Sequence, residues 1–335
     1  MPAPFFWVKS VPVQCSTLWP TREEAQRCPV GDIRLSLCGV CGLIYNRAFD
    51  PALLEREPAF DNATGFSSEL RKYHEEQAVD LICRHVLEHL HQPRELLGMI
   101  RQTAARRAGS VVFFEVPNAL HTLREMGIWD IIYVRCSYFT PRSLRRLIEG
   151  SGYTTGRTET RTGGQYICLE AGVDEGAAVP AARPSDDDAD AGKGTTEAAK
   201  GADEQAVEAV MTAEAEEVAA LAGTFGGKHR EKLAHWRRTL SDLFDDGARI
   251  AVWGAGAKGV TFLNALDDTR RVDCVVDPDP RKHGLFVPRA GHQVAAPETL
   301  GRVRPDVVIV MNPVQAKEIE QMLRDLSLAS RVLLA

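Results

Sequence analysis

Two groups of nearly continuous apolar segments limit what this chain can fold into. The first group holds VDLIC, from residue 79, and VVFFEVPN, from residue 111; the second holds IAVW, VDCVVD and VVIVMN, after residue 249. Segments this apolar are typical of parallel strands that helices cover on both faces, because neither face meets water. Helix-like text alternates with the strands in both groups, so we predict two α/β units, residues 51–171 and residues 248–335.

The rest of the chain divides by composition. Residues 172–204 are rich in Ala, Gly, Asp and Pro, which predicts a disordered linker because few apolar groups are available for a core. Residues 205–247 are predicted to be a helical connector that breaks at the glycines of residues 223–227. Residues 1–50 hold four of the eight cysteines and are predicted to form a small head.

Charge and hydropathy exclude several classes of protein. The 335 residues carry a formal net charge of -6, which gives no electrostatic reason for binding nucleic acid. No run of about 18 apolar residues occurs, so neither a membrane span nor a membrane partner is expected. The N-terminus lacks the basic start and apolar run of a signal peptide, and the isolated cysteines fit a reducing compartment. We therefore expect a cytoplasmic protein.

The head contains one close cysteine pair, Cys38-Gly-Val-Cys41. Two thiolates two residues apart on a tight turn can hold one tetrahedral metal. We predict a structural zinc site of Cys15, Cys38 and Cys41, completed by Cys28 or by a histidine. A redox-active pair is the less favoured alternative, because the pair does not lie between a strand and a helix.

Polar residues follow two predicted strands of the first unit. His85, Glu88 and His89 come after VDLIC, and Glu115 and Asn118 end the next strand. Proteins of the α/β class bind ligands at the carboxyl ends of their strands, so these residues are candidates for contact with a cofactor or a substrate. The alternative is that they cap turns and a helix start, with the histidines facing solvent.

A glycine-rich turn follows the strand IAVW of the second unit. Gly254, Gly256 and Gly259 open a helix there, and Asp277 ends the next strand. This arrangement is typical of a dinucleotide fingerprint, in which the helix start receives the phosphates and the acid a ribose. Lys258 beside the helix start would attract an anion. The alternative is that the glycines only allow the helix and the strand to pack closely.

Taken together, the motifs LCGVCGLIYN, VDLICRHVLEHL, EVPN and VWGAGAKG with VVDPDPRKHG resemble the sugar C-methyltransferase family, which acts on nucleotide-linked deoxysugars. The resemblance implies a zinc-binding head, a class I methyltransferase sheet and a C-terminal nucleotide-fold domain. It also implies zinc and S-adenosylmethionine as cofactors, and a nucleotide-sugar or a related small molecule as the partner. His85, Glu88 and His89 take cleft positions in this resemblance.

The sequence departs from the family at the position of its general base. The segment WDIIYVRCSY resembles a family segment in which Glu-His follows the tyrosine, here Tyr133, and the histidine resembles a general base. This chain has Val134 and Arg135 instead. Tyr133 and Arg135 remain the candidates at this catalytic position, but an arginine does not accept a proton at neutral pH.

A second departure concerns the methyl donor. A class I methyltransferase begins its sheet with a strand, a glycine-rich turn and a helix that hold S-adenosylmethionine, whereas Gly65 is the only glycine here between Gly42 and Gly98. We therefore predict an α/β fold with a truncated class I methyltransferase-like sheet, a Rossmann-like C-terminal domain and a cysteine-knuckle head. The expected function is that of a methyltransferase-family protein with weak or no activity. The alternatives are an NAD-like nucleotide-binding protein, or a non-catalytic partner, acting through the C-terminal domain.

A truncated sheet would leave the strand at residues 79–83 with a bare edge, which is an aggregation hazard. Residues 60–77, the helices of residues 206–244 or a second chain are the candidates to cover it, and we favour the latter two. The protein is accordingly expected to form an oligomer, to pair with an intact homologue, or to be poorly soluble alone.

Overall fold

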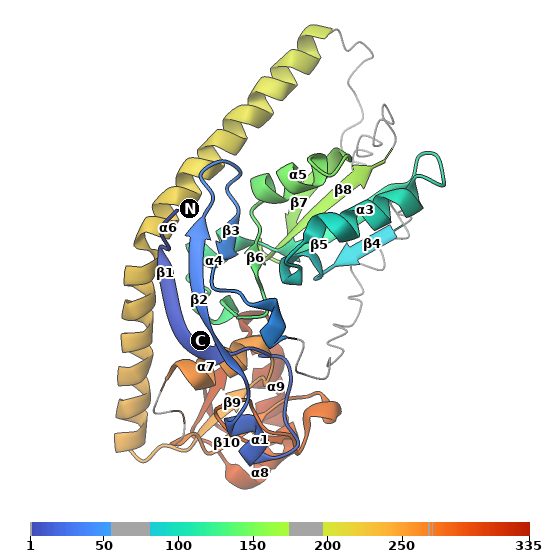
Figure 1. Ribbon diagram of the computed structural model, residues 1–335. Coiled ribbons are helices and arrows are strands. Elements are labelled where there is room, and N and C mark those ends of the chain that lie inside the picture. The colour runs from blue at the N-terminus through green and yellow to red at the C-terminus, as the bar shows by residue number, and fades with distance from the viewer. Residues whose placement is uncertain (1, 55–80, 174–196, 267–268, 270) are drawn as a thin grey trace, which may run out of the picture.

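The computed structural model describes residues 2–54, 81–173, 197–266, 269 and 271–335, and side chains throughout these ranges except in residues 197–210. The predicted α/β class is confirmed: a mixed sheet and an all-parallel sheet each pack against helices (Figure 1). The predicted edge cover at residues 60–77 and most of the predicted linker, residues 174–196, lie outside the described residues.

An antiparallel sheet begins the chain. Its strands are β1 (Phe6–Pro12), β2 (Val30–Leu37), β3 (Ile44–Asn46) and β6 (Ser137–Tyr138), in the order β1-β2-β3-β6, with α1 (Arg22–Gln26) between the first two. The last strand comes from the following unit, because Ile44 pairs with Tyr138. The predicted head is therefore joined to the next unit by strand pairing across the boundary placed at residue 50.

The middle sheet has the order β4-β5-β8-β7, formed by β4 (Leu81–Arg84), β5 (Val111–Pro117), β8 (Tyr166–Gly172) and β7 (Thr154–Arg161). Only β4 and β5 run parallel; β5, β8 and β7 are antiparallel to their neighbours. Strands β7 and β8 form a hairpin, and its turn uses positive φ at Thr162, Gly163 and Gly164. Within the described residues β4 pairs only with β5 and forms one edge of the sheet.

Helices α3 (Pro93–Ala104), α4 (Ala119–Arg124) and α5 (Pro141–Glu149) accompany this sheet. Pro141 occupies the first turn of α5, and the side chains of Thr140 and Ser143 cap each other's backbone N–H groups. Leu97 of α3 and Leu144 of α5 pack with Phe114 of β5 in one apolar cluster. The middle sheet is therefore a packed unit whose strand ends hold fixed positions.

Helix α6 (Glu197–Asp245) is 49 residues long and continuous, so the predicted break at residues 223–227 is wrong. Phe225 is fully buried, with its ring 5.2 Å from that of Phe6 on β1. A Cβ on Gly226 would lie 3.3 Å from the carbonyl oxygen of Phe5, so the glycine lets β1 approach the helix. Tertiary packing here outweighs the low helix propensity of glycine.

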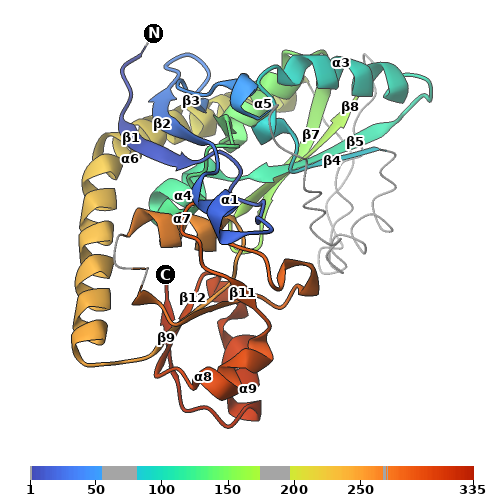
Figure 2. The same ribbon diagram turned by 60° about the horizontal axis from the view of Figure 1, so that its bottom comes forward.

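The course of α6 shows whether the helices of residues 206–244 cover the edge of β4. The helix packs against β1, α4 and α5 and lies on the opposite side of the molecule from β4 (Figures 1 and 2). The expectation that residues 206–244 cover the β4 edge is therefore wrong. No helix among the described residues is both long and apolar enough to cross a membrane.

The C-terminal unit is an all-parallel sheet in the order β11-β10-β9-β12-β13. Its strands are β9 (Ile250–Trp253), β10 (Cys274–Val276), β11 (Val294–Ala295), β12 (Val307–Val310) and β13 (Arg331–Leu334), and its helices are α7 (Ala257–Ala265), α8 (Leu300–Val303) and α9 (Ala316–Asp325). Short 3-10 turns lie at η1 (Pro51–Leu53), η2 (Leu87–His89), η3 (Ile128–Asp130), η5 (Pro280–Lys282), η6 (Pro297–Thr299) and η7 (Pro313–Gln315).

The C-terminal unit shares a hydrophobic core with the rest of the chain. Trp129 of η3 meets Phe262 of α7 edge to face at 5.0 Å between ring centroids, and Trp236 of α6 meets the same ring at 5.1 Å. Helix α7 packs against η3, and Figure 2 shows it beside α4, with α6 along one side. Helix α7, which follows the glycine-rich turn, is thereby held against η3 and α6.

Candidate functional site

Four polar side chains meet at the carboxyl ends of β4 and β5. His85 follows β4, Glu115 lies near the end of β5, and η2 carries Glu88 and His89. The two strands are parallel with Arg84 opposite Glu115, and the backbone N–H of His85 donates to the carbonyl of Glu115 at 2.9 Å. The structure therefore brings together the predicted cleft residues at the end of the sheet where the sequence placed them.

His85 lies between two carboxylates. Its Nε2 is 3.1 Å from Oε1 of Glu115 and its Nδ1 is 3.5 Å from Oε1 of Glu88. Burial, the largest single influence, lowers the pKa of this histidine, but the two carboxylates outweigh it and raise the pKa to about 9. His85 is therefore a cation at neutral pH, and it does not serve as a base there.

His89 has the opposite character. Its Nδ1 lies 3.0 Å from the carbonyl oxygen of Val134, so Nδ1 carries the hydrogen and Nε2 is left as the acceptor. Burial is the main cause that lowers the pKa of His89 below its usual 6.5. His89 is consequently neutral at pH 7 and able to accept a proton.

Glu88 is almost fully buried, and its Oε2 has no hydrogen-bond partner within the described residues. Burial acts to raise the pKa of this carboxyl, but the hydrogen bond from His85 and the nearby positive charges lower it overall. A buried, ionised oxygen without a donor is costly. Glu88 is therefore the group in the cluster that has a free acceptor for a ligand.

Sequence reasoning missed the role of Arg84. Its Nε and Nη2 donate to Oε1 of Glu115 at 2.9 Å and 2.7 Å, and Sγ of Cys168 on β8 lies 3.7 Å from Oε2. The signal was present, because Arg84 is the last residue of a strand whose other residues are apolar. The carboxylate of Glu115 is therefore already paired with Arg84 and His85 inside the protein.

Tyr133 is a packing residue in this structure. It is fully buried, its ring stacks on Phe49 at 5.5 Å, and its hydroxyl accepts the backbone N–H of Asp50 at 2.8 Å. A Cβ on Gly31 would lie 2.2 Å from the Tyr133 ring, so the ring fills the space against β2. These contacts tie the tyrosine to the N-terminal sheet, and its predicted catalytic role gains no support from them.

Arg135 lies near the cluster without entering it. Its Nη1 donates to the carbonyl of Asp130 at 3.0 Å, and its guanidinium sits 5.6 Å from the ring centroid of Tyr138. Its charge also helps to lower the pKa values of Glu88 and His89. Arg135 therefore supplies positive charge at the position where the resembling family has its base.

The glycine-rich turn after β9 is used for packing. A Cβ on Gly259 would lie 1.9 Å from the carbonyl oxygen of Gly254, which itself has a φ of +110°, whereas Gly256 has open space around it. Lys258, the expected attraction for an anion, pairs instead with Asp130 of η3 at 3.1 Å. These contacts support the close-packing interpretation of Gly254 and Gly259.

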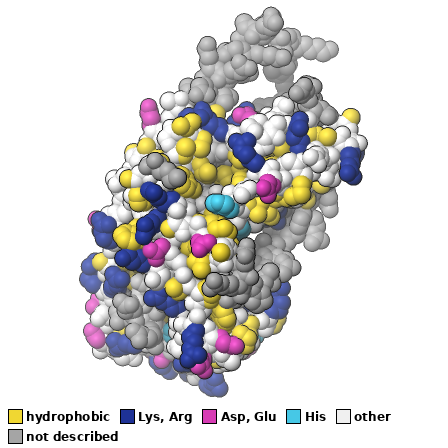
Figure 3. Space-filling model, viewed as in Figure 1, with side chains coloured by type: hydrophobic (Ala, Val, Ile, Leu, Met, Phe, Trp, Pro, Cys, Tyr) yellow, Lys and Arg dark blue, Asp and Glu magenta, His cyan; other side chains and the backbone are white. Residues whose placement is uncertain are grey.

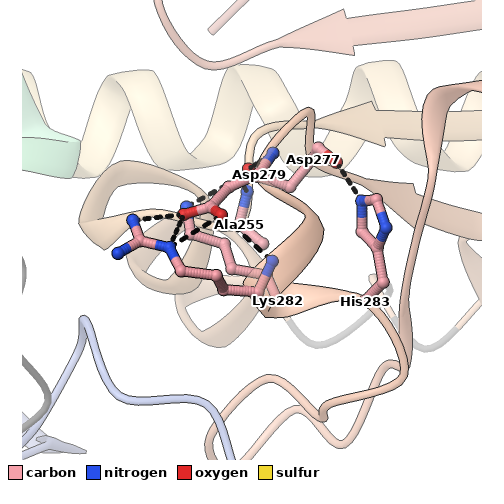
Figure 4. A network of polar contacts seen from close by, with 6 residues as sticks. Ala255, Asp277, Asp279, Lys282 and His283 are labelled. Atoms are coloured by element: carbon pink, nitrogen blue, oxygen red, sulfur yellow. Dashed lines mark hydrogen bonds and ion pairs between the residues drawn. The ribbon is translucent and has the colours of Figure 1, made fainter. Parts of the chain in front are cut away.

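Asp277, the expected ribose acceptor, already accepts hydrogen bonds from neighbouring residues of the protein. Its Oδ2 accepts the backbone N–H of Ala255 at 2.8 Å and Nζ of Lys282 at 2.9 Å, and its Oδ1 accepts the N–H of Asp279 at 3.0 Å (Figure 4). Nε2 of His283 contacts the backbone carbonyl of Asp277 at 2.8 Å. A carboxylate with both oxygens engaged is not available to a ribose, which argues against a dinucleotide site at this turn.

The three predicted zinc ligands do not come together. Within the described residues, no group of three or more His, Cys, Asp or Glu side chains is placed to hold a metal. Cys15 is buried beside Ser16, whereas Cys38 and Cys41 form a separate, partly exposed pair on the turn before β3. The described residues therefore give no support to a site of Cys15, Cys38 and Cys41, because Cys15 belongs to the core.

Two known protein families match segments of this chain, and together the segments include most of its helices and strands. Residues 30–156 match the family described as Methyltransferase domain, and residues 193–330 match the family described as C-methyltransferase C-terminal domain. No curated protein matches the chain. The first match contains the cluster at the ends of β4 and β5, and the second contains α6 and the strands β9, β10, β11 and β12 of the parallel sheet. The chain is therefore a methyltransferase-family protein that carries a C-methyltransferase C-terminal domain.

Proposed function

We propose that this chain is an impaired S-adenosylmethionine-dependent C-methyltransferase of nucleotide-linked sugars, one that has lost affinity for its methyl donor. The observation that supports the loss is the position of β4, which is the edge of its sheet within the described residues. In a class I methyltransferase this strand follows the part of the sheet that holds the donor. The sequence supports the same view, since Gly65 is the only glycine between Gly42 and Gly98.

The side chains at the end of β4 fit the donor poorly. S-adenosylmethionine needs a close backbone approach for its amino-acid part and a free carboxylate for its ribose hydroxyls. Glu115 is committed to Arg84 and His85. Glu88 has one free oxygen, but its other oxygen lies 3.5 Å from His85. Within the described part of this strand end, one oxygen of Glu88 is therefore the only carboxylate acceptor left for the ribose hydroxyls.

The acid–base part of the reaction is better preserved. Methylation of a sugar carbon beside a carbonyl requires a base to remove a proton from that carbon. Arg135, at the position of the resembling family's base, cannot do this, and His85 is a cation at neutral pH. His89 is neutral, and its Nε2, which lies 3.8 Å from Oε1 of Glu88, is the ring nitrogen that is not bonded to the backbone. The proposal therefore assigns the loss to donor binding, and assigns the remaining basic group to His89.

The test is a direct titration of the folded protein with S-adenosylmethionine. The proposal predicts no binding heat at donor concentrations that saturate an intact methyltransferase in a parallel titration. Binding with a dissociation constant in the micromolar range would overturn the loss of the donor site. It would leave the family membership intact, because that rests on the matched segments.

A further inference from the structure

Helices α3 and α5 lie side by side on one face of the middle unit, and this α3/α5 face is strongly basic (Figure 1). The helices and the residues that follow α3, 93–107 and 141–149, hold seven arginines and two glutamates, a formal net charge of +5. The whole chain carries -6. Figure 3 shows basic side chains over the two helices, with hydrophobic side chains beside them. Positive charge is therefore gathered here on an otherwise acidic protein.

Three arginines of this face are held in place by backbone carbonyls. Nη1 of Arg94 donates to the carbonyl of Gly150 at 2.6 Å, and Nη1 of Arg146 donates to that of Val40 at 2.7 Å. Arg101 makes a similar bond to the loop after α5. None of the three has a carboxylate partner within the described residues. A guanidinium has five N–H donors, so each of these arginines keeps donors for a ligand and loses little freedom on binding one.

An apolar cavity of about 480 Å³ lies on the same face, between the start of α3, helix α5 and the turn before β3. Leu43, Phe139 and Leu147 form its apolar lining, and Arg94 and Arg146 line it as well. A cavity of this size is large enough for an aromatic side chain. Two fixed cations, one from each helix, therefore stand beside an apolar cavity.

Exposed apolar side chains accompany the cavity. Val40, on the turn before β3, is 76% exposed, and Met99 of α3 is 58% exposed. Glu95 is the one acid among the described residues that line the cavity, and it lies in the first turn of α3, where the helix dipole suits a negative charge. Cations, exposed apolar groups and a cavity on one surface are typical of a site that binds another protein.

The basic groups favour a partner that carries carboxylates. All the cations of residues 93–107 and 141–149 are arginines, whose planar fork matches a carboxylate with two parallel hydrogen bonds. The chain has an acidic stretch of its own, residues 174–196, with six carboxylates. That stretch contains no Leu, Ile, Met or aromatic residue, so it offers no large side chain for the cavity. A segment of another protein fits the face better.

We propose that the α3/α5 face docks an acidic segment of a partner protein. One large apolar side chain of the segment enters the cavity, and its Asp or Glu residues pair with Arg94, Arg101 and Arg146. The apolar anchor supplies most of the affinity, and the arginines supply selectivity and fast association. The inference goes beyond the proposed function, because this docking involves neither the methyl donor nor a sugar, and no residue of the cluster at the ends of β4 and β5 lines the cavity.

The test is calorimetric titration of the full chain with the capped peptide acetyl-Asp-Glu-Trp-Glu-Asp-amide. It should bind with a micromolar dissociation constant. One control peptide has glycine in place of tryptophan and the other has lysine in place of every acid; both should bind more weakly. The double variant Arg94→Ala/Arg146→Ala should weaken binding of the tryptophan peptide at least about tenfold. Arg238→Ala/Arg302→Ala is the matched control, because it removes two exposed arginines that do not line the cavity; it should leave the affinity unchanged.

A second measurement needs no variant, since Arg94 and Arg146 also bond to the backbone and their loss can unsettle the fold. Hydrogen exchange of the wild-type chain, followed by mass spectrometry with and without the tryptophan peptide, locates the bound peptide. The peptide should slow exchange in residues 91–103 and 141–149. Slowed exchange elsewhere, with no change in these two segments, would place the peptide on another surface and overturn the proposal.

The remaining outcomes also overturn the proposal. Absence of binding at millimolar peptide removes the site, and equal affinity for the glycine peptide or the lysine peptide removes the apolar anchor or the charge selection. Equal affinity of the folded Arg94→Ala/Arg146→Ala variant removes the role of the arginines. A peptide of residues 174–196 that binds as tightly as the tryptophan peptide would assign the face to the chain itself. Binding to phosphatidylserine vesicles in place of the peptide would assign it to a membrane.

Discussion

Nε2 of His85 and Oε1 of Glu115 lie 3.1 Å apart across the carboxyl ends of β4 and β5. The same carboxylate oxygen accepts both Nε and Nη2 of Arg84. One buried carboxylate thus balances two cations, with Glu88 as the second negative group. The arrangement holds the two strand ends together and keeps His85 protonated.

Replacing Glu115 by Gln should return the pKa of His85 from about 9 toward the ordinary value of 6.5. The amide keeps the shape of the side chain but removes the charge that stabilises the imidazolium. Titration of the His85 ring by NMR measures this directly. Glu159→Gln is a suitable control, because Glu159 pairs with Arg157 and Arg161 on β7. An unchanged His85 pKa in Glu115→Gln would contradict the assignment.

The raised pKa of His85 also predicts a pH-dependent stability. A group whose folded-state pKa exceeds its unfolded value stabilises the protein fully below the unfolded pKa, here 6.5, and the contribution is lost as the pH rises through about 9. The shift corresponds to at most about 3 kcal/mol. The stability difference between the wild type and His85→Gln, measured by urea unfolding, should therefore shrink between pH 6.5 and pH 9. A difference that grows over this range would show the opposite linkage.

Gly259→Ala should destabilise the C-terminal unit strongly, because the added Cβ would lie 1.9 Å from the carbonyl oxygen of Gly254. Overpacking against backbone costs about 3 kcal/mol or more. Gly256→Ala is the matched control in the same turn, since no heavy atom lies within 4 Å of its added Cβ; loss of a glycine N-cap costs at most about 1 kcal/mol. Thermal unfolding compares the two variants. Equal losses would mean that close packing does not explain Gly259.

The apolar strands can be predicted well from the sequence, whereas the long-range contacts between elements cannot. Apolar continuity is a local property, so β4, β5, β9 and β12 could be placed from text alone. The continuity of α6 could not be predicted, because Gly226 is stabilised in the helix by the approach of Phe5 from the other end of the chain. The glycines of residues 223–227 suggest a helix break, but tertiary packing keeps the helix continuous there.

For the candidate sites as well, the sequence predicts the positions of residues along the strands but not the contacts that form only in three dimensions. His85, Glu88 and Glu115 were placed together because the carboxyl ends of parallel neighbours share one edge of a sheet. Asp277 has the spacing of a ribose acceptor, yet its partners Ala255 and Lys282 follow from three-dimensional contacts. Spacing indicates where a side chain stands along the chain, but it does not report which hydrogen bonds are already made.

The separation of the cysteines predicts a selective thiol chemistry. Cys38 is partly exposed, and hydrogen bonds from the backbone at Cys41 and Val40 lower its pKa, whereas burial raises the pKa of Cys15 to about 11 and that of Cys168 to about 12. Iodoacetamide should therefore modify Cys38 first in the folded protein. Mass spectrometry of peptides after short exposure locates the label. Modification of Cys15 as fast as Cys38, without unfolding, would contradict the burial of Cys15.

We propose that the methyl-donor site is lost while the rest of the methyltransferase-like fold is kept. Isothermal titration of the folded chain with S-adenosylmethionine tests this loss, with an intact methyltransferase as the positive control for the ligand. Loss of the donor site predicts no measurable binding heat and no rise in the melting temperature at millimolar S-adenosylmethionine, since a ligand that binds the native state must stabilise it. A micromolar dissociation constant with a matching rise in melting temperature would contradict it.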